Sequence, residues 1–182
     1  MTDVFRTISS CIIALFCCLL PVFSITGEHP ILIISSYNPD AGRTSGNISD
    51  FMEEFQRLGG TNTIALENMN CKSFSEAPLW KNKMEELLAK YRGKRSPVLL
   101  VLIGQEAWTA YLSQADSIRG NVPVLAALAS RNAIILPDDS VDLKTWMPDA
   151  VDFFNDFPNS SVKAGFVYEY DVEANINLIK KL

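Results

Sequence analysis

The chain has 182 residues and a formal net charge of −5, with 48% apolar and 20% charged residues. This balance supports one ordinary folded domain, or one domain with part of a second, and excludes a disordered or collagen-like chain. The acidic net charge argues against a nucleic-acid-binding protein, because binding to phosphates requires a basic face.

Residues 1–27 have the pattern of an export signal. No charged side chain occurs from Thr7 to Gly27, Arg6 precedes this segment and Glu28 follows it. A basic flank, a short apolar centre and small residues near the end are typical of secretory signals, and the positive-inside rule directs the rest of the chain outward. We therefore expect a periplasmic or inner-membrane-attached protein. The segment is either a cleaved signal peptide or a retained signal-anchor, with a buried core helix as a further alternative.

The chain has few of the residues on which metal and nucleophile chemistry depends. Of its four cysteines only Cys71 lies beyond the export segment, so the exported part has no internal disulfide and relies on its apolar core. The single histidine, His29, excludes a site of several histidines and leaves one residue for a Ser-His-Asp triad. We expect no metal, no cofactor and no catalytic residue.

The first half of the exported part alternates strand-like and helix-like segments. Residues 31–35 form a continuous apolar run, which is typical of parallel strands buried on both faces. After a turn cluster at residues 38–42, apolar side chains recur at helical spacing over residues 48–58. A short strand is predicted at residues 63–66, and the next helix extends from an N-cap at Ser75 to Tyr91.

The second half continues the alternation, beginning with the most apolar strand of the chain at residues 97–103. The further predictions are a helix over 105–112, strands over 122–128 and 133–136, a helix over 143–157, a strand over 162–168 and a helix over 172–182. This order requires a parallel sheet with helices on both faces, joined by right-handed crossovers. The predicted fold class is therefore α/β, a Rossmann-like doubly wound parallel sheet.

Ligands of doubly wound sheets bind beyond the carboxyl ends of the strands, and this rule selects the candidate site. The side chains that follow four of the predicted strands are rich in hydroxyls, amides and aromatic rings, which suits a small polar organic ligand or an anion. The candidates are Ser36, Tyr37, Asn38 and Arg43 after the first strand, Asn68 after the second, Gln105, Glu106 and Trp108 after the third, and Ser130, Arg131 and Asn132 after the fourth.

Several candidates also have a structural alternative. Residues 36–38 can serve as turn residues, and Glu106 can favour the start of a helix. Trp108 can belong to the core, and Arg131 can pair with a carboxylate. The small-residue segment 42–47 follows the first strand and could cradle a phosphate, but it lacks the glycine spacing of nucleotide-binding loops. A flavodoxin-like FMN loop would use a similar run of Thr, Ser and Gly, so a flavodoxin-like FMN enzyme remains an alternative.

Several local strings add a family resemblance. They are ILIISSYNPD, ENMNCKSFSEAPLWK, LLVLIGQEAW, VPVLAALASRNAIILPDD and VKAGFVYEYDVEANINLIKKL. Together with the export signal, residues 30–182 resemble the periplasmic sensor region of bacterial hybrid two-component histidine kinases. Those regions are similar to type I periplasmic binding proteins and ABC substrate-binding-protein-like domains.

The resemblance implies two Rossmann-like lobes that close on a small molecule. Residues 28–140 would form lobe one, and residues 141–182 would begin a second lobe that this chain leaves incomplete. The implied function is a non-catalytic, extracytoplasmic sensor domain, attached to the membrane through its N-terminal segment or a downstream span. The alternatives are a solute-binding component of an ABC-type transporter and an exported structural or partner-binding module, including a homodimer.

Overall fold

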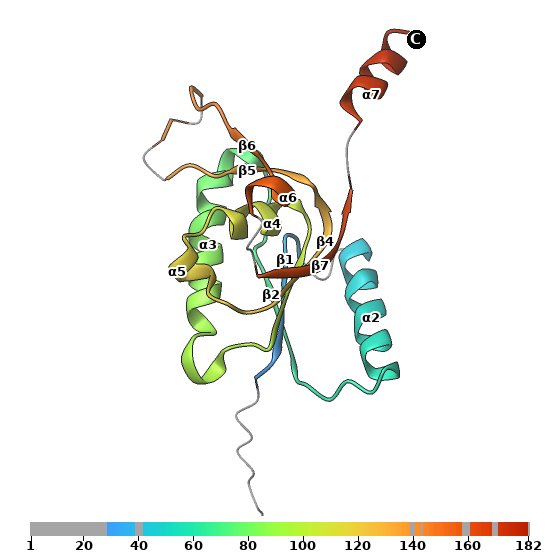
Figure 1. Ribbon diagram of the computed structural model, residues 1–182, viewed down its shortest axis with the longest axis vertical. Coiled ribbons are helices and arrows are strands. Elements are labelled where there is room, and N and C mark those ends of the chain that lie inside the picture. Colours follow the sequence, from blue (N-terminus) through green and yellow to red (C-terminus); the bar gives the residue numbers. More distant parts are fainter. Residues whose placement is uncertain are drawn as a thin grey trace, which may run out of the picture.

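The computed structural model describes residues 29–38, 42–138, 141–142, 144–157, 161–168 and 171–181. The predicted export signal lies outside these residues. The elements are β1 (Ile31–Ser35), α2 (Gly42–Arg57), β2 (Ile64–Asn68), α3 (Ala77–Lys90), β3 (Leu99–Ile103), α4 (Gln105–Leu112), α5 (Asp116–Arg119), β4 (Val124–Ser130), β5 (Asn132–Ile135), β6 (Asp149–Asp152), α6 (Phe153–Asp156), β7 (Val162–Tyr168) and α7 (Val172–Ile179) (Figure 1).

Five parallel strands form the central sheet, in the order β2-β1-β3-β4-β7. This arrangement confirms the predicted α/β class and the parallel sheet. The chain adds β2 on one side of β1 and then places β3 on the other side, so the direction of winding reverses between β1 and β3. In open α/β sheets a crevice forms at this point, beyond the carboxyl ends of the two strands.

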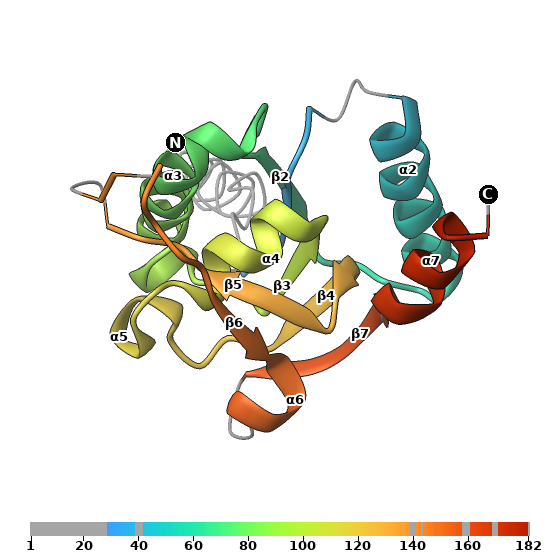
Figure 2. The same ribbon diagram turned by 90° about the horizontal axis from the view of Figure 1, so that it is seen from above.

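Helices cover both faces of the sheet, as the sequence predicts. Figure 2 shows α2 on one side and α3, α4 and α5 on the other. Successive side chains of a strand point to opposite faces, so β1 contributes Leu32 and Ile34 to one core cluster and Ile31 and Ile33 to the other. The cluster under α3 and α4 is the larger and includes Trp108, which has no exposed surface. This core fixes the carboxyl edge of the sheet on which the site is built.

The predicted helix over residues 143–157 is wrong. Asp149–Asp152 pair with Asn132–Ile135 as the antiparallel two-stranded sheet of β6 and β5, and only Phe153–Asp156 are helical. The apolar spacing that suggested a helix has a different cause, because Trp146 stacks on Phe74 at 5.8 Å between ring centroids. Tertiary contacts therefore outweigh the helical pattern here.

Two smaller expectations about element boundaries also fail. Ser75 is not the N-cap of α3, because it lies within a short 3-10 helix at Phe74–Glu76 and Glu76 takes the cap position. The fourth strand begins and ends two residues later than predicted, at Val124–Ser130, so Ser130 belongs to the strand itself.

The last described strand joins the first sheet. Residues 141–182 are expected from the sequence to begin a second lobe, but β7 pairs in parallel with β4 and adds a fifth strand. A side chain at Gly165 would lie 2.6 Å from the carbonyl oxygen of Ala126, so glycine permits this close pairing. The central sheet therefore extends to Tyr168. Figure 1 shows α7 beyond the carboxyl end of β7, away from α3 and α4.

None of the helices in the described part of the chain combines the length and apolar character needed to span a bilayer.

Replacement of Trp108 tests the assignment of this residue to the core. The indole has no exposed surface and packs edge-on against Phe153 at 4.8 Å between ring centroids. We expect Trp108→Ala to lower the free energy of unfolding by about 3–5 kcal/mol, because the cavity it leaves cannot fully collapse. Urea denaturation measures this loss. The control is Leu79→Ala, at a side chain that is 60% exposed; similar losses in both variants would contradict the assignment.

Candidate functional site

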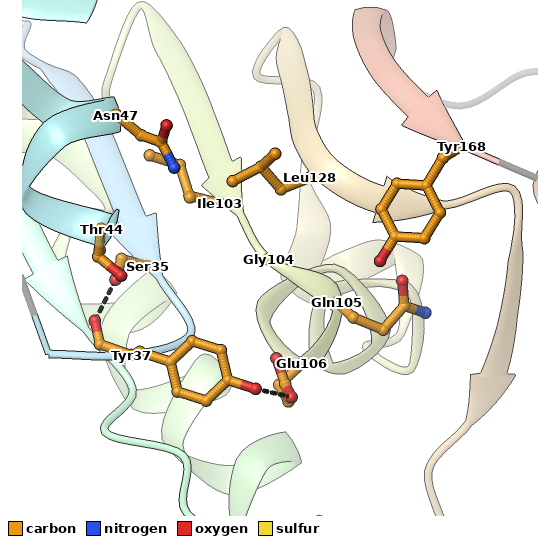
Figure 3. A pocket seen from close by; sticks show the side chains of 10 residues that line it. All are labelled: Ser35, Tyr37, Thr44, Asn47, Ile103, Gly104, Gln105, Glu106, Leu128 and Tyr168. Atoms are coloured by element: carbon orange, nitrogen blue, oxygen red, sulfur yellow. Dashed lines mark hydrogen bonds between the residues drawn. The ribbon is translucent and has the colours of Figure 1, made fainter. Parts of the chain in front are cut away.

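A cavity of about 700 Å³ opens at the carboxyl edge of the sheet (Figure 3). It lies at the reversal point between β1 and β3, where the fold class places its ligand sites. Four strand ends and two helices contribute to the walls. The lining residues are Ser35, Tyr37, Thr44, Asn47, Ile103, Gly104, Gln105, Glu106, Leu128 and Tyr168.

Ser36 holds the floor of this region together. Its N–H donates to the carbonyl of Ile103 at 2.8 Å, and its own carbonyl accepts the N–H of Cys71 at 2.9 Å. Its hydroxyl oxygen accepts the N–H of Ala107 in the first turn of α4, at 2.9 Å. Ser36 thus satisfies one of the free amides at the helix start. These three hydrogen bonds join β1, β3, α4 and the segment after β2.

Gly104 permits the close approach between β3 and Ser36. Its φ is +97°, a conformation that side chains rarely adopt, and an added Cβ would lie 2.5 Å from the Ser36 hydroxyl oxygen. The turn at Gly104 directs the start of α4 toward the cavity. Two neighbouring side chains at that start, Gln105 and Glu106, therefore reach the lining.

Tyr37 and Glu106 face each other across part of the cavity (Figure 3). The Tyr37 hydroxyl donates to Oε1 of Glu106, and this hydrogen bond, followed by burial, raises the pKa of Tyr37 above its usual range. Tyr37 is consequently a neutral donor at physiological pH. The second carboxylate oxygen, Oε2, is buried and has no hydrogen-bond partner within the described part of the chain.

Gln105 anchors the opposite wall. Its Oε1 accepts the N–H of Ser130 at 2.6 Å, and its Nε2 donates to the carbonyl of Asn132 at 3.4 Å and to the Thr109 hydroxyl at 3.3 Å. The amide therefore ties the start of α4 to the end of β4 and the start of β5. Because both ends of the amide have partners, Gln105 positions this wall and offers a ligand mainly its remaining lone pairs.

A bulge in β4 shapes the cavity mouth. The pairing of β4 with β7 shifts between Ala127 and Ala129, and Leu128 between them has a φ of +57°. A non-glycine residue in the left-handed region costs roughly 1–2 kcal/mol, and such strain clusters at functional sites. The bulge places the Leu128 side chain, 41% exposed, on the cavity wall.

The structure brings three of the predicted site residues into the lining: Tyr37, Gln105 and Glu106. Ser36 is buried beneath them and acts through α4, as described above. Trp108 does not line the cavity, because it points into the core. The strand-end rule selected Trp108, but α4 turns this side chain into the core, where it packs against Phe153.

The candidates after the fourth strand have structural roles instead. Arg131 binds Asp152 of β6 through two hydrogen bonds, of 3.0 Å from Nε and 2.7 Å from a terminal nitrogen. Ser130 is buried and its hydroxyl oxygen accepts the N–H of Asn132 at 3.2 Å. These contacts hold the β5–β6 hairpin against the sheet, and none of the three residues lines the cavity.

The remaining candidates divide into two groups. Asn38 and Asn68 are described and lie outside the lining. Arg43 lies in the first turn of α2, but its side chain is outside the described part of the structure. The segment 42–47, expected as a loop that could cradle a phosphate, is instead the start of α2.

Seven lining residues were absent from the sequence prediction. Thr44 and Asn47 belong to the small-residue segment that the sequence does single out, so a helical interpretation of that segment would have found them. Ser35 and Tyr168 end strands and Gly104 directly follows one, which is the signal used for the other candidates. Ile103 and Leu128 carry no chemical signal, and Leu128 reaches the wall only through the bulge.

The described lining offers polar groups that can form hydrogen bonds to a small molecule. Among the described residues, no group of three His, Cys, Asp or Glu side chains gathers as metal ligands would. Cys71, near the floor, is buried, and desolvation raises the pKa of its thiol to about 12. A thiol in this state is a weak nucleophile. The lining offers hydroxyls, amides, two phenol rings and one carboxylate.

Neither the protein-family models nor the curated proteins and solved structures contain a match to this chain.

Alanine at Gly104 tests the contact with Ser36. Gly104 and Gly120 both have positive φ, of 97° and 64°, but a Cβ at Gly120 would meet no atom within 4 Å. Each change to Ala carries a backbone penalty of roughly 1–3 kcal/mol. We expect Gly104→Ala to destabilise by at least about 1 kcal/mol more than Gly120→Ala, because overpacking against Ser36 adds to it. Equal losses in urea denaturation would show that Ser36 moves away freely.

The Arg131–Asp152 pair predicts a dependence of stability on pH. The hydrogen bond from Arg131 lowers the pKa of Asp152. The pair therefore stabilises the fold above the unfolded-state pKa of about 3.9, and the contribution disappears as the pH falls through the lower pKa of the folded state. We expect the stability difference between wild type and Asp152→Asn to shrink as the pH falls below about 4.

The same measurement in an Arg131→Met background is the control, because asparagine can still cap α6 while the ion pair is already absent. In this background the pH-dependent effect of Asp152→Asn on urea denaturation should be smaller, because only the backbone N–H groups of Phe154 and Asn155 then lower the pKa of Asp152. An effect as large as in the presence of Arg131 would assign the lowered pKa to the cap.

Proposed function

We propose that this chain is the small-molecule-binding, non-catalytic sensor domain of an exported signalling protein. The observation that carries the proposal is the open, polar-lined cavity at the reversal point between β1 and β3. Its volume of about 700 Å³ lies within the range of 300–1,000 Å³ that is usual for ligand sites. Its walls combine apolar side chains with a few placed polar groups, as such sites do.

The arrangement of polar groups favours binding over turnover. The ionisable side chains in the described lining are Tyr37, Glu106 and Tyr168. Tyr37 and Glu106 are already joined by a hydrogen bond, and this bond stabilises the protonated phenol. General acid–base catalysis needs groups that titrate near the working pH, and a raised tyrosine pKa moves away from it. The pair is better suited to orienting a ligand.

The proposal includes the predicted Rossmann-like, periplasmic-binding-protein-like architecture and export by residues 1–27. In this arrangement the five-stranded sheet is lobe one, and a second lobe follows β7. The exposed apolar side chains of α7, Ile176, Leu178 and Ile179, are available to pack against it. Ligand closure of two lobes would bias a signalling equilibrium by the difference in affinity between open and closed forms. A solute-binding component of an ABC-type transporter would use the same cavity.

An FMN-binding protein is a second candidate, because the strand order and the position of the crevice match those of flavodoxin-like folds. The residues of the lining make the FMN-binding protein the weaker of the two candidates. A flavin phosphate would meet the Glu106 carboxylate, and no basic side chain is among the described lining residues. Release of a flavin from the purified protein on denaturation would favour this candidate.

Thermal unfolding with small molecules tests the binding function. We expect at least one compound in a panel of amino acids, amines, sugars and carboxylic acids to stabilise the full chain. A ligand at one hundred times its Kd contributes about 2.7 kcal/mol. Asn47→Trp should abolish the response, because this exposed residue of α2 lines the cavity and the indole would occupy it.

The matched control is Gln56→Trp, at an exposed position on the same helix outside the lining. This variant should respond as the wild type does. A panel without any stabilising compound, or equal responses of the two variants, would reject the proposed function.

A further inference from the structure

We propose that the ligand carries an ammonium group, and that the cavity receives it beside the Glu106 carboxylate and the rings of Tyr37 and Tyr168. The inference rests on the proposed function and narrows the polar ligand to a cationic class. It also excludes the anion that the sequence left open. Three features of the cavity support it: the Glu106 carboxylate in its wall, the balance of charge, and the aromatic walls.

The first feature is the state of the Glu106 carboxylate. Oε1 accepts the Tyr37 hydroxyl, whereas Oε2 is buried without a hydrogen-bond partner from the described residues. A buried acceptor that lacks a donor is unfavourable, and more so when it carries charge. Glu106 lies in the first turn of α4, at the positive end of the helix dipole. Because Oε2 has no exposed surface, an ammonium group in the cavity would act on this carboxylate through its opposite charge.

The second feature is the charge balance around the cavity. Glu106 is the one formally charged side chain among the described lining residues. Arg131, the cation predicted for this site, is bound to Asp152 instead, and Lys90 is bound to Glu67 on β2. An anion entering the cavity would therefore meet a carboxylate with no cation beside it among the described lining residues. A cation would be attracted to the same carboxylate, in a partly water-excluded space where interactions between charges are strong.

The third feature is the pair of tyrosine rings. Figure 3 shows Tyr37 beside Glu106 and Tyr168 on the other side of the cavity, near Gln105. The face of an aromatic ring attracts a cation within about 6 Å of its centre. The same electron-rich face repels an anion. Thr44, Asn47 and Gln105 remain for uncharged polar groups of the ligand, and Ile103 and Leu128 for its apolar part.

Matched probes that differ only in charge test this inference. We propose calorimetric titration of the full chain with phenethylamine, phenethyl alcohol and phenylacetate, and with butylamine, butanol and butyrate. The amine of each set should bind at least about tenfold more tightly than the alcohol, and the carboxylate should bind most weakly. Glu106→Gln keeps an acceptor for Tyr37 but removes the charge, so the amine should lose its advantage over the alcohol.

Two further variants distinguish a specific role of Glu106 from a general loss of negative charge. Glu106→Asp keeps the charge and should retain the order amine, alcohol, carboxylate even where all three bind more weakly. Glu67→Gln removes a half-buried carboxylate that pairs with Lys90 and Tyr91 outside the cavity, and should leave the order and the ratio unchanged.

The possible failures separate the two proposals. If an alcohol or a carboxylate binds as tightly as its amine, and Asn47→Trp blocks it, the cationic class is wrong and the binding function stands. An amine preference that survives Glu106→Gln also overturns the inference. If neither these probes nor the broader panel bind, both proposals fail.

Discussion

The three hydrogen bonds of Ser36 fix the floor beneath the cavity at the carboxyl edge of the sheet. One side chain and its backbone join the ends of β1 and β3, the segment after β2 and the first turn of α4. The junction is possible only because Gly104 has no Cβ, which would lie 2.5 Å from the serine oxygen. Ser36 is buried beneath the cavity lining, and the cavity opens above it at the carboxyl edge of the sheet.

The start of α4 illustrates how two adjacent polar residues take different roles. Gln105 is engaged by Ser130, Asn132 and Thr109, so it holds the wall in place. Glu106, one residue later, points to the other side and keeps one carboxylate oxygen without a partner among the described residues. Gln105 holds the cavity wall in place, and Glu106 gives that wall its carboxylate.

The parallel strands were predictable because their side chains are apolar on both faces, and this pattern identifies a buried parallel strand without any tertiary information. The rule that polar residues after such strands meet at one edge of the sheet also needs no tertiary information, and it identified Tyr37, Gln105 and Glu106. The failures share a cause. Trp146 contributes to an apparent helical stripe, yet it is apolar because a distant residue, Phe74, packs against it.

The sequence by itself determined the α/β class, the buried strands and the residue types available at the carboxyl edge, because these depend on local hydrophobic patterns and chain order. The tertiary structure alone decided which of those residues face the cavity. Arg131 is outside the cavity lining because it binds the carboxylate of Asp152, on a later strand. Leu128 is part of the lining because the pairing of β4 with β7 contains a bulge at this residue. Both outcomes depend on contacts between segments that no local pattern records.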